Sequence, residues 1–482
     1  RMIAKDTAST ARATAKPGVA AVRSRLSDTR LVQNRGRVTQ MIGLVIESQG
    51  PMASVGEICR IESQVTGAST LAEVVGFRDR NLLLMPLGEV QGICPGSEVV
   101  ATGHSLRVPV GEELLGRVID GMGHPLDDLG EIPKLPLAEL DLNTPHPLKR
   151  DRIAEPFTTG IRAIDTFTPM GRGQRLGIFA GSGVGKSTLM GMMASKAEAD
   201  VNVIALIGER GREVRDFLER DLSPEGRAKS VVVVATSNVP ALTRVKGTFL
   251  AMTIAEYFRS KGKNVLLMMD SITRFAMAQR EIGLAIGEPP SSRGYTPSVF
   301  SLMPQLLERA GNDDQGSITG LFNVLVEGDD MNDPVADAAR SVLDGHLVLS
   351  RELAAQNHYP AVDVLESVSR LSHDLLTRED LDVMGSARES MAVHRKSRDL
   401  LSIGAYQAGS NPQIDRAIQL HEPLNGFLKQ NVDDASPREE SWHTLRQLMA
   451  AHPLPGSEAP PAAEVPMQSL QPPAPQPQPP MI

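Results

Sequence analysis

The feature that most constrains how this chain folds is a glycine-rich turn between an apolar run, Leu176–Phe179, and a helix-forming run, Thr188–Ala197. The turn reads Ala180-Gly181-Ser182-Gly183-Val184-Gly185-Lys186-Ser187. A strand, a glycine-rich turn ending in Lys-Ser and a helix, in this order, are typical of a phosphate-binding loop. Glycines let consecutive backbone N–H groups point at one anion, and the positive end of the helix dipole adds to the attraction. Ala180 replaces the usual first glycine, which leaves the turn at Gly183 and Gly185 intact.

Two side chains of the loop and one distant carboxylate form a candidate nucleotide and metal site. We expect Lys186 to reach the outer phosphates of a nucleotide and the Ser187 hydroxyl to ligate Mg²⁺. The apolar run Asn264–Met269 ends in Asp270. A carboxylate at the carboxyl end of a buried strand lies where a parallel sheet presents its ligand site, and there it can hold the water shell of Mg²⁺. Many strands end in an aspartate that caps the next helix, so the metal role depends on the pairing with the loop.

Hydrolysis also requires a group that positions water and a positive charge near the transferred phosphate. Glu209 follows the buried-type strand Val203–Ile207 and is therefore expected at the same sheet edge as the loop. The surrounding charges also fit a solvated cluster that opens a helix. Composition does not identify the arginine that completes the site.

The patterns along the 482 residues predict two or three domains. Short apolar runs separated by glycine and proline, from Val38 to about Val110, predict a small β-barrel. Strands alternating with helices, up to about Arg370, predict an α/β domain with a mainly parallel sheet. Polar runs of helical period after Leu371 predict a C-terminal helical domain. The expected division is a basic arm at 1–36, a β-barrel at 37–110, an α/β domain at 111–370, a helical domain at 371–451 and a disordered proline-rich tail at 452–482.

Individual elements can be placed within these regions. The barrel strands are expected within the runs Met41–Ser48, Leu71–Phe77, Asn81–Pro86 and Glu98–Ala101. The buried strands of the sheet are expected at Leu176–Ala180, Val203–Ile207, Val231–Ala235 and Val265–Met269. The terminal helices are expected at Leu371–Met384, Arg388–Ile403 and Pro412–Leu420.

Charge and cysteine usage exclude several classes of protein. The net charge of −8 would repel nucleic acid and anionic membranes, so any such contact must be local.

The arm at 1–36 holds eight basic and two acidic side chains, a local charge of +6 (8 − 2). Its composition fits a transit peptide, a membrane-surface helix or a disordered arm, and the lack of a large apolar face favours an arm that is disordered or folds on a partner. Cys59 and Cys94 lie far apart with no Cys or His ligand spacing around them, so neither a disulfide framework nor a zinc site is indicated. A reducing cytosol fits this cysteine usage. No apolar run approaches the ~20 residues that span a bilayer.

Taken together, the motifs resemble the rotary and secretion ATPases related to the catalytic subunit of ATP synthase, from about residue 38 to residue 430. The resemblance is carried by Gly177–Ser187, Gly208–Arg210, Asp270–Phe275, Ser292–Tyr295, Tyr359–Asp363 and Ser367–Arg370. Within that family, three stretches are most similar to the flagellum-specific export ATPases of bacteria: Ile42–Pro51, Leu82–Pro86 and Val326–Asn332. The injectisome ATPases are nearly as similar.

The resemblance implies a central RecA-like P-loop domain that binds ATP as substrate together with Mg²⁺. The nucleotide-binding residues it implies are Ala180, Gly181, Ser182, Gly183, Val184, Gly185, Lys186, Ser187, Thr188 and Tyr359, with Ser187 and Asp270 at the metal. The catalytic residues it implies are Glu209 acting on water, Lys186 on the phosphates, Arg210 and Arg274 in support, and Arg370 as an arginine finger that enters the neighbouring subunit's site. Without the resemblance, Tyr359 fits an ordinary core or interface aromatic and Arg370 a structural salt bridge.

The resemblance also implies partners and a location. We expect a homohexameric ring in the cytoplasm, at the inner-membrane face of an export apparatus. The expected partners are a stator-like regulator, a central-stalk-like protein, export chaperone–substrate complexes and a membrane export gate contacted peripherally, with no nucleic acid.

Three other functions compete with export. A rotary ATP synthase catalytic subunit carries a strongly acidic lever segment, whereas the matching stretch Ile403–Pro412 contains no acidic residue. A hexameric RNA translocase would need aromatic platforms on its barrel, where Phe77 is the single aromatic residue between Val38 and Val110. A non-catalytic nucleotide-binding subunit would be expected to lack the carboxylate at Glu209. Export driven by ATP hydrolysis is therefore favoured.

Overall fold

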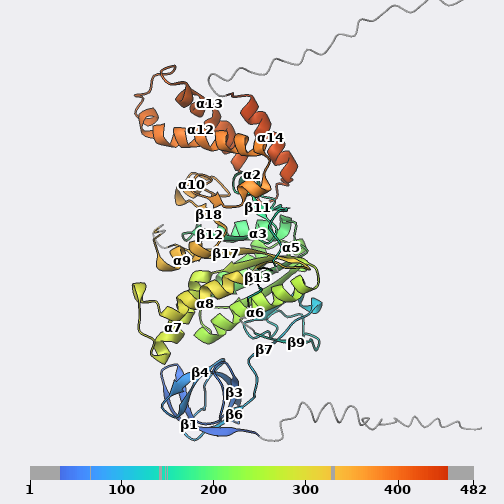
Figure 1. Ribbon diagram of the computed structural model, residues 1–482, viewed down its shortest axis with the longest axis vertical. Coiled ribbons are helices and arrows are strands. Elements are labelled where there is room, and N and C mark those ends of the chain that lie inside the picture. Colours follow the sequence, from blue (N-terminus) through green and yellow to red (C-terminus); the bar gives the residue numbers. More distant parts are fainter. Residues whose placement is uncertain are drawn as a thin grey trace, which may run out of the picture.

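The computed structural model describes residues 33–65, 67–140, 144–146, 148, 150–326, 330 and 332–453. Three units follow one another along its long axis: a barrel at one end, a sheet covered by helices in the middle and a group of helices at the other end (Figure 1). This arrangement confirms the predicted fold class. Of the basic arm and the proline-rich tail, all but residues 33–36 and 452–453 lie outside the described residues.

The barrel is closed by antiparallel pairing in the order β1-β2-β5-β4-β3-β6. Its strands are β1 (Arg35–Ile42), β2 (Val45–Gln49), β3 (Ile58–Glu62), β4 (Ser69–Arg78), β5 (Asn81–Pro86) and β6 (Glu98–Ala101). Side chains such as Ile46, Val74 and Leu84 fill its interior. The run Met41–Ser48, expected as one strand, is instead a hairpin, because Gly43 takes a left-handed conformation (φ 59°) that glycine adopts without strain and turns β1 into β2.

The central sheet has the strand order β19-β18-β12-β17-β15-β13-β14-β8 within the described residues, and β16 pairs with β17 beside this path. All neighbours along the path are parallel except β19, which is antiparallel to β18. The strands are β8 (Val118–Asp120), β12 (Arg175–Ala180), β13 (Val201–Ile207), β14 (Ser230–Ala235), β15 (Asn264–Asp270), β16 (Gly311–Asn312), β17 (Ser317–Leu325), β18 (Gly345–Leu349) and β19 (Val368–Ser369). The four strands expected for the sheet are present and lie side by side with one strand, β17, that the sequence did not reveal.

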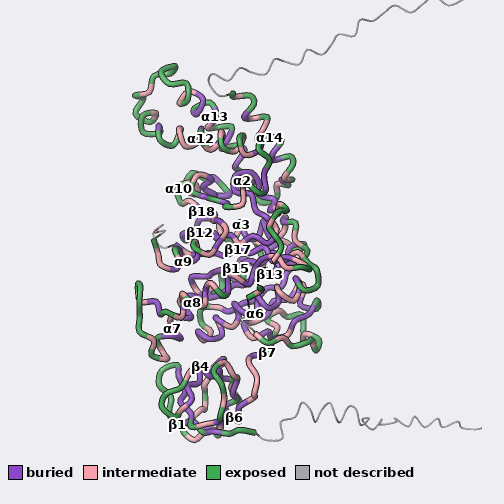
Figure 2. Tube along the Cα trace, viewed as in Figure 1, coloured by how far each residue is buried: buried purple, intermediate pink, exposed green. Residues whose placement is uncertain are grey.

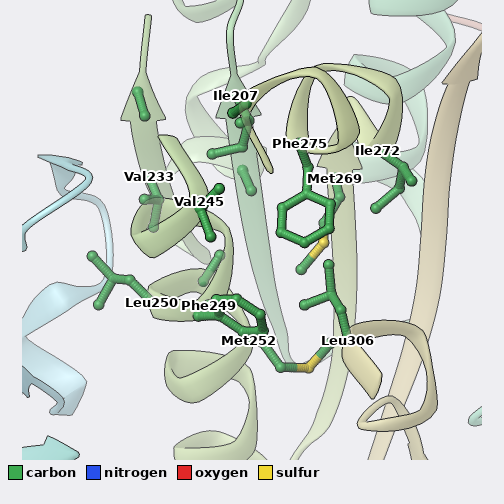
Figure 3. Packing of buried hydrophobic residues seen from close by; sticks show 14 of the residues in the cluster. Ile207, Val233, Val245, Phe249, Leu250, Met252, Met269, Ile272, Phe275 and Leu306 are labelled. Carbon is green, nitrogen blue, oxygen red and sulfur yellow. The ribbon is translucent and has the colours of Figure 1, made fainter. Parts of the chain in front are cut away.

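Helices cover both faces of this sheet, because successive strand residues point to opposite sides. Val203 and Ala205 join one apolar cluster and Ile204 joins the other. On the first face lie α6 (Ala241–Ser260), α7 (Ile272–Ile286), α8 (Pro297–Glu308) and α9 (Pro334–Val342). Figure 3 shows Phe249 of α6 and Phe275 of α7 close together over the sheet, with ring centroids 5.9 Å apart in an edge-to-face arrangement.

The second face is covered by shorter elements. These are α2 (Arg162–Phe167), α3 (Lys186–Lys196), α4 (Gly211–Asp216), a single π-helical turn η3 (Phe217–Asp221) and α5 (Pro224–Ala228). Two small two-stranded sheets flank the central one, β7 (Arg107–Pro109) with β9 (Leu137–Glu139) and β10 (Pro156–Phe157) with β11 (Met170–Gly171). The 3₁₀ turns η1 (Glu112–Leu114) and η4 (Ser292–Gly294) and the short helix α10 (Arg351–Ala355) lie in connections. Figure 2 shows that burial is concentrated in the strands of the central unit.

The helical unit at the far end contains α11 (Ser372–Leu375), α12 (Arg378–Ser402), α13 (Pro412–Leu428) and α14 (Arg438–Ala450). The expected helices Leu371–Met384 and Arg388–Ile403 were wrongly divided. The break lies at Thr377, whose side chain accepts a hydrogen bond from the Asp380 N–H and caps a new helix that continues without interruption to Ser402. No described helix is long and apolar enough to cross a membrane.

Candidate active site

The glycine-rich loop connects β12 to α3, as its sequence predicts. Ala180 is the buried last residue of β12, and Gly183 and Gly185 have positive φ angles of 79° and 86°, which a residue with a Cβ rarely adopts. A Cβ at Gly185 would lie 3.3 Å from the Tyr359 ring, so the tyrosine rests against the loop. A Cβ at Gly181 would lie 2.6 Å from the Arg351 guanidinium, so the Arg351 side chain packs closely against the loop at Gly181.

The structure brings Lys186, Asp270 and Glu209 together at the carboxyl edge of the sheet. Lys186 Nζ donates to Asp270 Oδ1 at 2.5 Å and lies 3.9 Å from Glu209 Oε1. Leu206 pairs with Asp270 in the register of β13 and β15, which places the residues that follow β13 beside the end of β15. The ends of β12, β13 and β15, which are distant in sequence, therefore place the Lys186 ammonium close to the carboxylates of Glu209 and Asp270.

Burial and charge make Glu209 an unusual carboxylate. Its desolvation, followed by the neighbouring Asp270 charge and the hydrogen-bonded Glu213, raises the pKa of Glu209 to about 7, while Lys186 opposes this shift. Its Oε1 is buried and has no hydrogen-bond partner among the described residues. A carboxylate with a pKa near neutrality and a free oxygen facing a cleft is suited to accept a proton or hold a water molecule.

Two arginines lie beside this group. Arg274, in the first turn of α7, has a buried Nε that lacks a hydrogen-bond partner within the described part of the chain, and its side chain occupies the space that a Cβ at Gly208 would need. Arg210 is largely exposed and donates to Glu213 at 3.1 Å. Both line the same cleft as Lys186, so they add positive charge to it.

The cleft has two connected parts. The part around Lys186 has a volume of about 460 Å³, and it is lined by Ser182, Ser187, Glu209, Asp270 and Arg274 among others. The second part, of about 650 Å³, is lined by Tyr359 and Pro360 and by residues 429–432. Gly183, Gly185 and Thr188 border both parts, so a ligand with phosphates in the first can extend into the second.

No sequence motif indicates that residues 429–432 lie at the cleft. This segment follows α13 and lies more than 240 residues beyond the loop, in a stretch without a recognisable motif. Only the packing of the helical unit against the central unit places it at the cleft.

Arg370 lies apart from these residues. It follows β19, is exposed, and donates from Nη2 to the Arg340 carbonyl oxygen at 3.1 Å. It lines neither part of the cleft of its own chain.

Comparisons with known proteins agree with this arrangement. Residues 38–103 match the beta-barrel domain of the ATP synthase alpha/beta family, residues 160–369 match its nucleotide-binding domain, and residues 376–447 match the T3SS EscN ATPase C-terminal domain. The chain is 54% identical to the flagellum-specific ATP synthase of Bacillus subtilis over 416 residues, which cover 86% of this chain and 94% of that protein. It is 46% identical to the type 3 secretion system ATPase of Xanthomonas euvesicatoria, over 86% of this chain and 93% of that protein.

The solved structure of the assembled ATPase EscN from the type III secretion system of enteropathogenic E. coli superposes with a TM-score of 0.81 and 45% identity, over 86% of this chain and 99% of that chain. EscN has also been solved in complex with its central stalk EscO, with a TM-score of 0.79 to this chain.

The fold and the cleft define a P-loop ATPase with an N-terminal barrel and a C-terminal helical unit. The chain belongs to the ATP synthase alpha/beta family, in its branch of flagellar and type III secretion ATPases.

Proposed function

We propose that this ATPase hydrolyses Mg-ATP to energise the export of flagellar proteins by a type III pathway. The observation that carries the proposal is the convergence of Lys186, Asp270 and the partly unsatisfied Glu209 beside the glycine-rich loop. The flagellar assignment is supported by the higher identity to the Bacillus subtilis flagellar relative, 54%, than to the Xanthomonas euvesicatoria secretion ATPase, 46%.

The residues present fit a magnesium ion. Ser187 and Asp270 supply a hydroxyl and a carboxylate, the hard oxygen ligands that Mg²⁺ prefers, and both line the phosphate part of the cleft. Asp270 is 4% exposed and its charge is now balanced by Lys186. When bound, the ion would neutralise charge on the phosphates.

The remaining steps of ATP binding and hydrolysis are assigned to side chains and backbone groups of the cleft. The loop from Ala180 to Thr188 binds the phosphates through its N–H groups, and Lys186 binds the outer phosphates. Glu209 holds the attacking water and accepts its proton, while Arg210 and Arg274 stabilise the charge around it. Tyr359 forms the wall on which the adenine stacks.

We further propose that the site is completed by assembly. Because Arg370 lies outside its own cleft, it is free to act on a neighbour's phosphate in a homohexameric ring. EscN forms an assembly and binds a central stalk, which supports a ring and a stalk-like partner for this chain. A stator-like regulator, export chaperone–substrate complexes and a peripheral contact with a membrane export gate complete the proposed set, in the cytoplasm at the inner-membrane face.

The test is genetic and uses the source bacterium. A chromosomal Lys186→Ala allele should leave normal amounts of the protein but abolish hook and filament proteins in the culture medium. Lys263→Ala, which removes an exposed lysine far from the loop, is the matched control and should export normally. Normal flagellar export with Lys186→Ala would contradict the proposal, and loss of a separate set of secreted effectors with intact flagella would assign the chain to an injectisome.

A further inference from the structure

Gln430 occupies the junction between the helical unit and the second part of the cleft. It lies two residues beyond the end of α13 at Leu428, is 5% exposed, and belongs to residues 429–432, which form one wall of this part of the cleft, while Tyr359 forms another. Its backbone N–H donates to the Tyr359 carbonyl oxygen at 2.9 Å. The two walls of this part of the cleft, about 70 residues apart in sequence, are therefore joined through one residue.

The side-chain amide of Gln430 is fully used. Its Oε1 accepts from the Arg162 N–H at 2.9 Å, and its Nε2 donates to the carbonyl oxygens of Gly160 at 2.8 Å and Asp434 at 3.3 Å. Arg162 is the first residue of α2, whose N–H has no partner within its own helix. A glutamine amide offers both an acceptor and two donors, so it can bind an N–H and two carbonyls at once. Glutamate has the same shape but lacks the donors.

Neighbouring contacts hold the same segment independently of this amide. Arg162 Nη2 donates to the Lys429 carbonyl oxygen at 2.9 Å, and Lys196 Nζ donates to the Asp434 carbonyl oxygen at 2.6 Å. Loss of the Gln430 amide should therefore displace the wall of the cleft without detaching the helical unit. The phosphate part of the cleft, around Lys186, contains none of these contacts.

We propose that Gln430 is the positioning residue for the nucleotide base, since it fixes the 429–432 wall against α2 and against the backbone of Tyr359. This inference rests on the proposed ATP site. The hydrogen bonds of this one buried side-chain amide set the distance between the two walls of the cleft, and the base lies between these walls. Affinity for the base then depends on Gln430, whereas affinity for the phosphates does not.

The test compares Gln430→Met and Gln430→Glu with wild type. Methionine keeps the length and removes the hydrogen bonds, and glutamate in addition turns a carboxylate toward two carbonyl oxygens. Gln419→Glu, on the exposed face of α13, is the matched control. Binding of Mg-ATP and of Mg-tripolyphosphate, which has no base, is measured by calorimetry, and ATP hydrolysis is measured at steady state.

We expect Gln430→Met to weaken ATP binding and raise KM about tenfold, as for one or two buried groups left without partners, with kcat within about twofold of wild type. Gln430→Glu should weaken ATP binding further, and tripolyphosphate should bind all variants alike. Unchanged ATP binding by Gln430→Met would overturn the inference, and so would an equal loss for ATP and tripolyphosphate, which would indicate a merely structural role. Binding and hydrolysis are measured separately. If the wild type failed to hydrolyse ATP, the proposed function would be contradicted, but the comparison of ATP and tripolyphosphate binding among the variants would still test the role of Gln430.

Discussion

Arg370 provides the sharpest test of how the active site is completed. Within the described part of its own chain, the side chain makes one hydrogen bond, to the Arg340 carbonyl oxygen at 3.1 Å, and it is exposed. Removing it in Arg370→Ala should therefore cost the fold about 1 kcal/mol or less. An arginine that acts in trans on the transferred phosphate contributes ~10³ to 10⁵ in rate. The predicted loss of activity is thus far larger than any loss of stability can explain.

The assay mixes two inactive variants. Arg370→Ala chains keep Glu209, and Glu209→Gln chains keep Arg370. If each site takes its arginine from a neighbour, random rings made from equal amounts contain intact interfaces at about one in four positions, and about a quarter of the wild-type rate should return. Size-exclusion chromatography confirms that the two chains co-assemble. No recovery in co-assembled rings would show that Arg370 acts within its own subunit or has no catalytic part.

Three further predictions concern the cleft and its support. Since burial and the Asp270 charge raise the pKa of Glu209 to about 7, its ionised form is gained as the pH rises through 7, and kcat/KM for ATP should rise over that range; a flat profile from pH 6 to 8 would contradict its role as the base. EDTA should abolish hydrolysis and added Mg²⁺ should restore it, whereas activity that persists in EDTA would rule out the metal. Gly191→Ala should destabilise the protein by about 1–3 kcal/mol and lower Tm, because the new Cβ would lie 2.1 Å from the Asp221 carbonyl oxygen. Gly385→Ala, with open space at the same atom in α12, should leave Tm unchanged or raise it, and equal Tm changes for the two variants would refute the packing argument.

Much of the central unit could be predicted because its strands are buried on both faces. Val201–Ile207 and Ser230–Ala235 are nearly unbroken apolar runs, and a parallel sheet requires such runs. Asp270 and Glu209 could be placed at the sheet edge for the same reason, since Asp270 ends a strand of this kind and Glu209 follows another.

The sequence pattern does not predict β17, although this strand lies in the middle of the sheet. Thr319, Gly320 and Asn323 interrupt its apolar pattern. A Cβ at Gly320 would lie 2.5 Å from the ring of Phe322, two residues further along the same strand, so the placement of this buried ring favours glycine over a residue with higher strand preference. Asn323 is buried and donates to the sulfur of Met190, a contact that no single-sequence pattern reveals.

The second part of the cleft could not be predicted from residue patterns either. The resemblance alone indicated Tyr359, and nothing indicated the 429–432 wall. Tyr359 and residues 429–432 meet because Gln430 forms hydrogen bonds to Gly160 and Arg162 at the start of α2 and to the backbone of Tyr359. These contacts form only when the chain is folded. Local sequence carries no record of such long-range hydrogen bonds.

The central claim is that the cleft at Lys186, Asp270 and Glu209 hydrolyses ATP with Glu209 acting on water. Its most direct test is a paired measurement on assembled Glu209→Gln protein: calorimetric binding of Mg-ATP and steady-state hydrolysis. Glutamine keeps the shape but cannot accept the proton, so binding should stay within about twofold of wild type while kcat falls by about 10² to 10⁴. A kcat near that of wild type, with binding intact, would contradict the assignment.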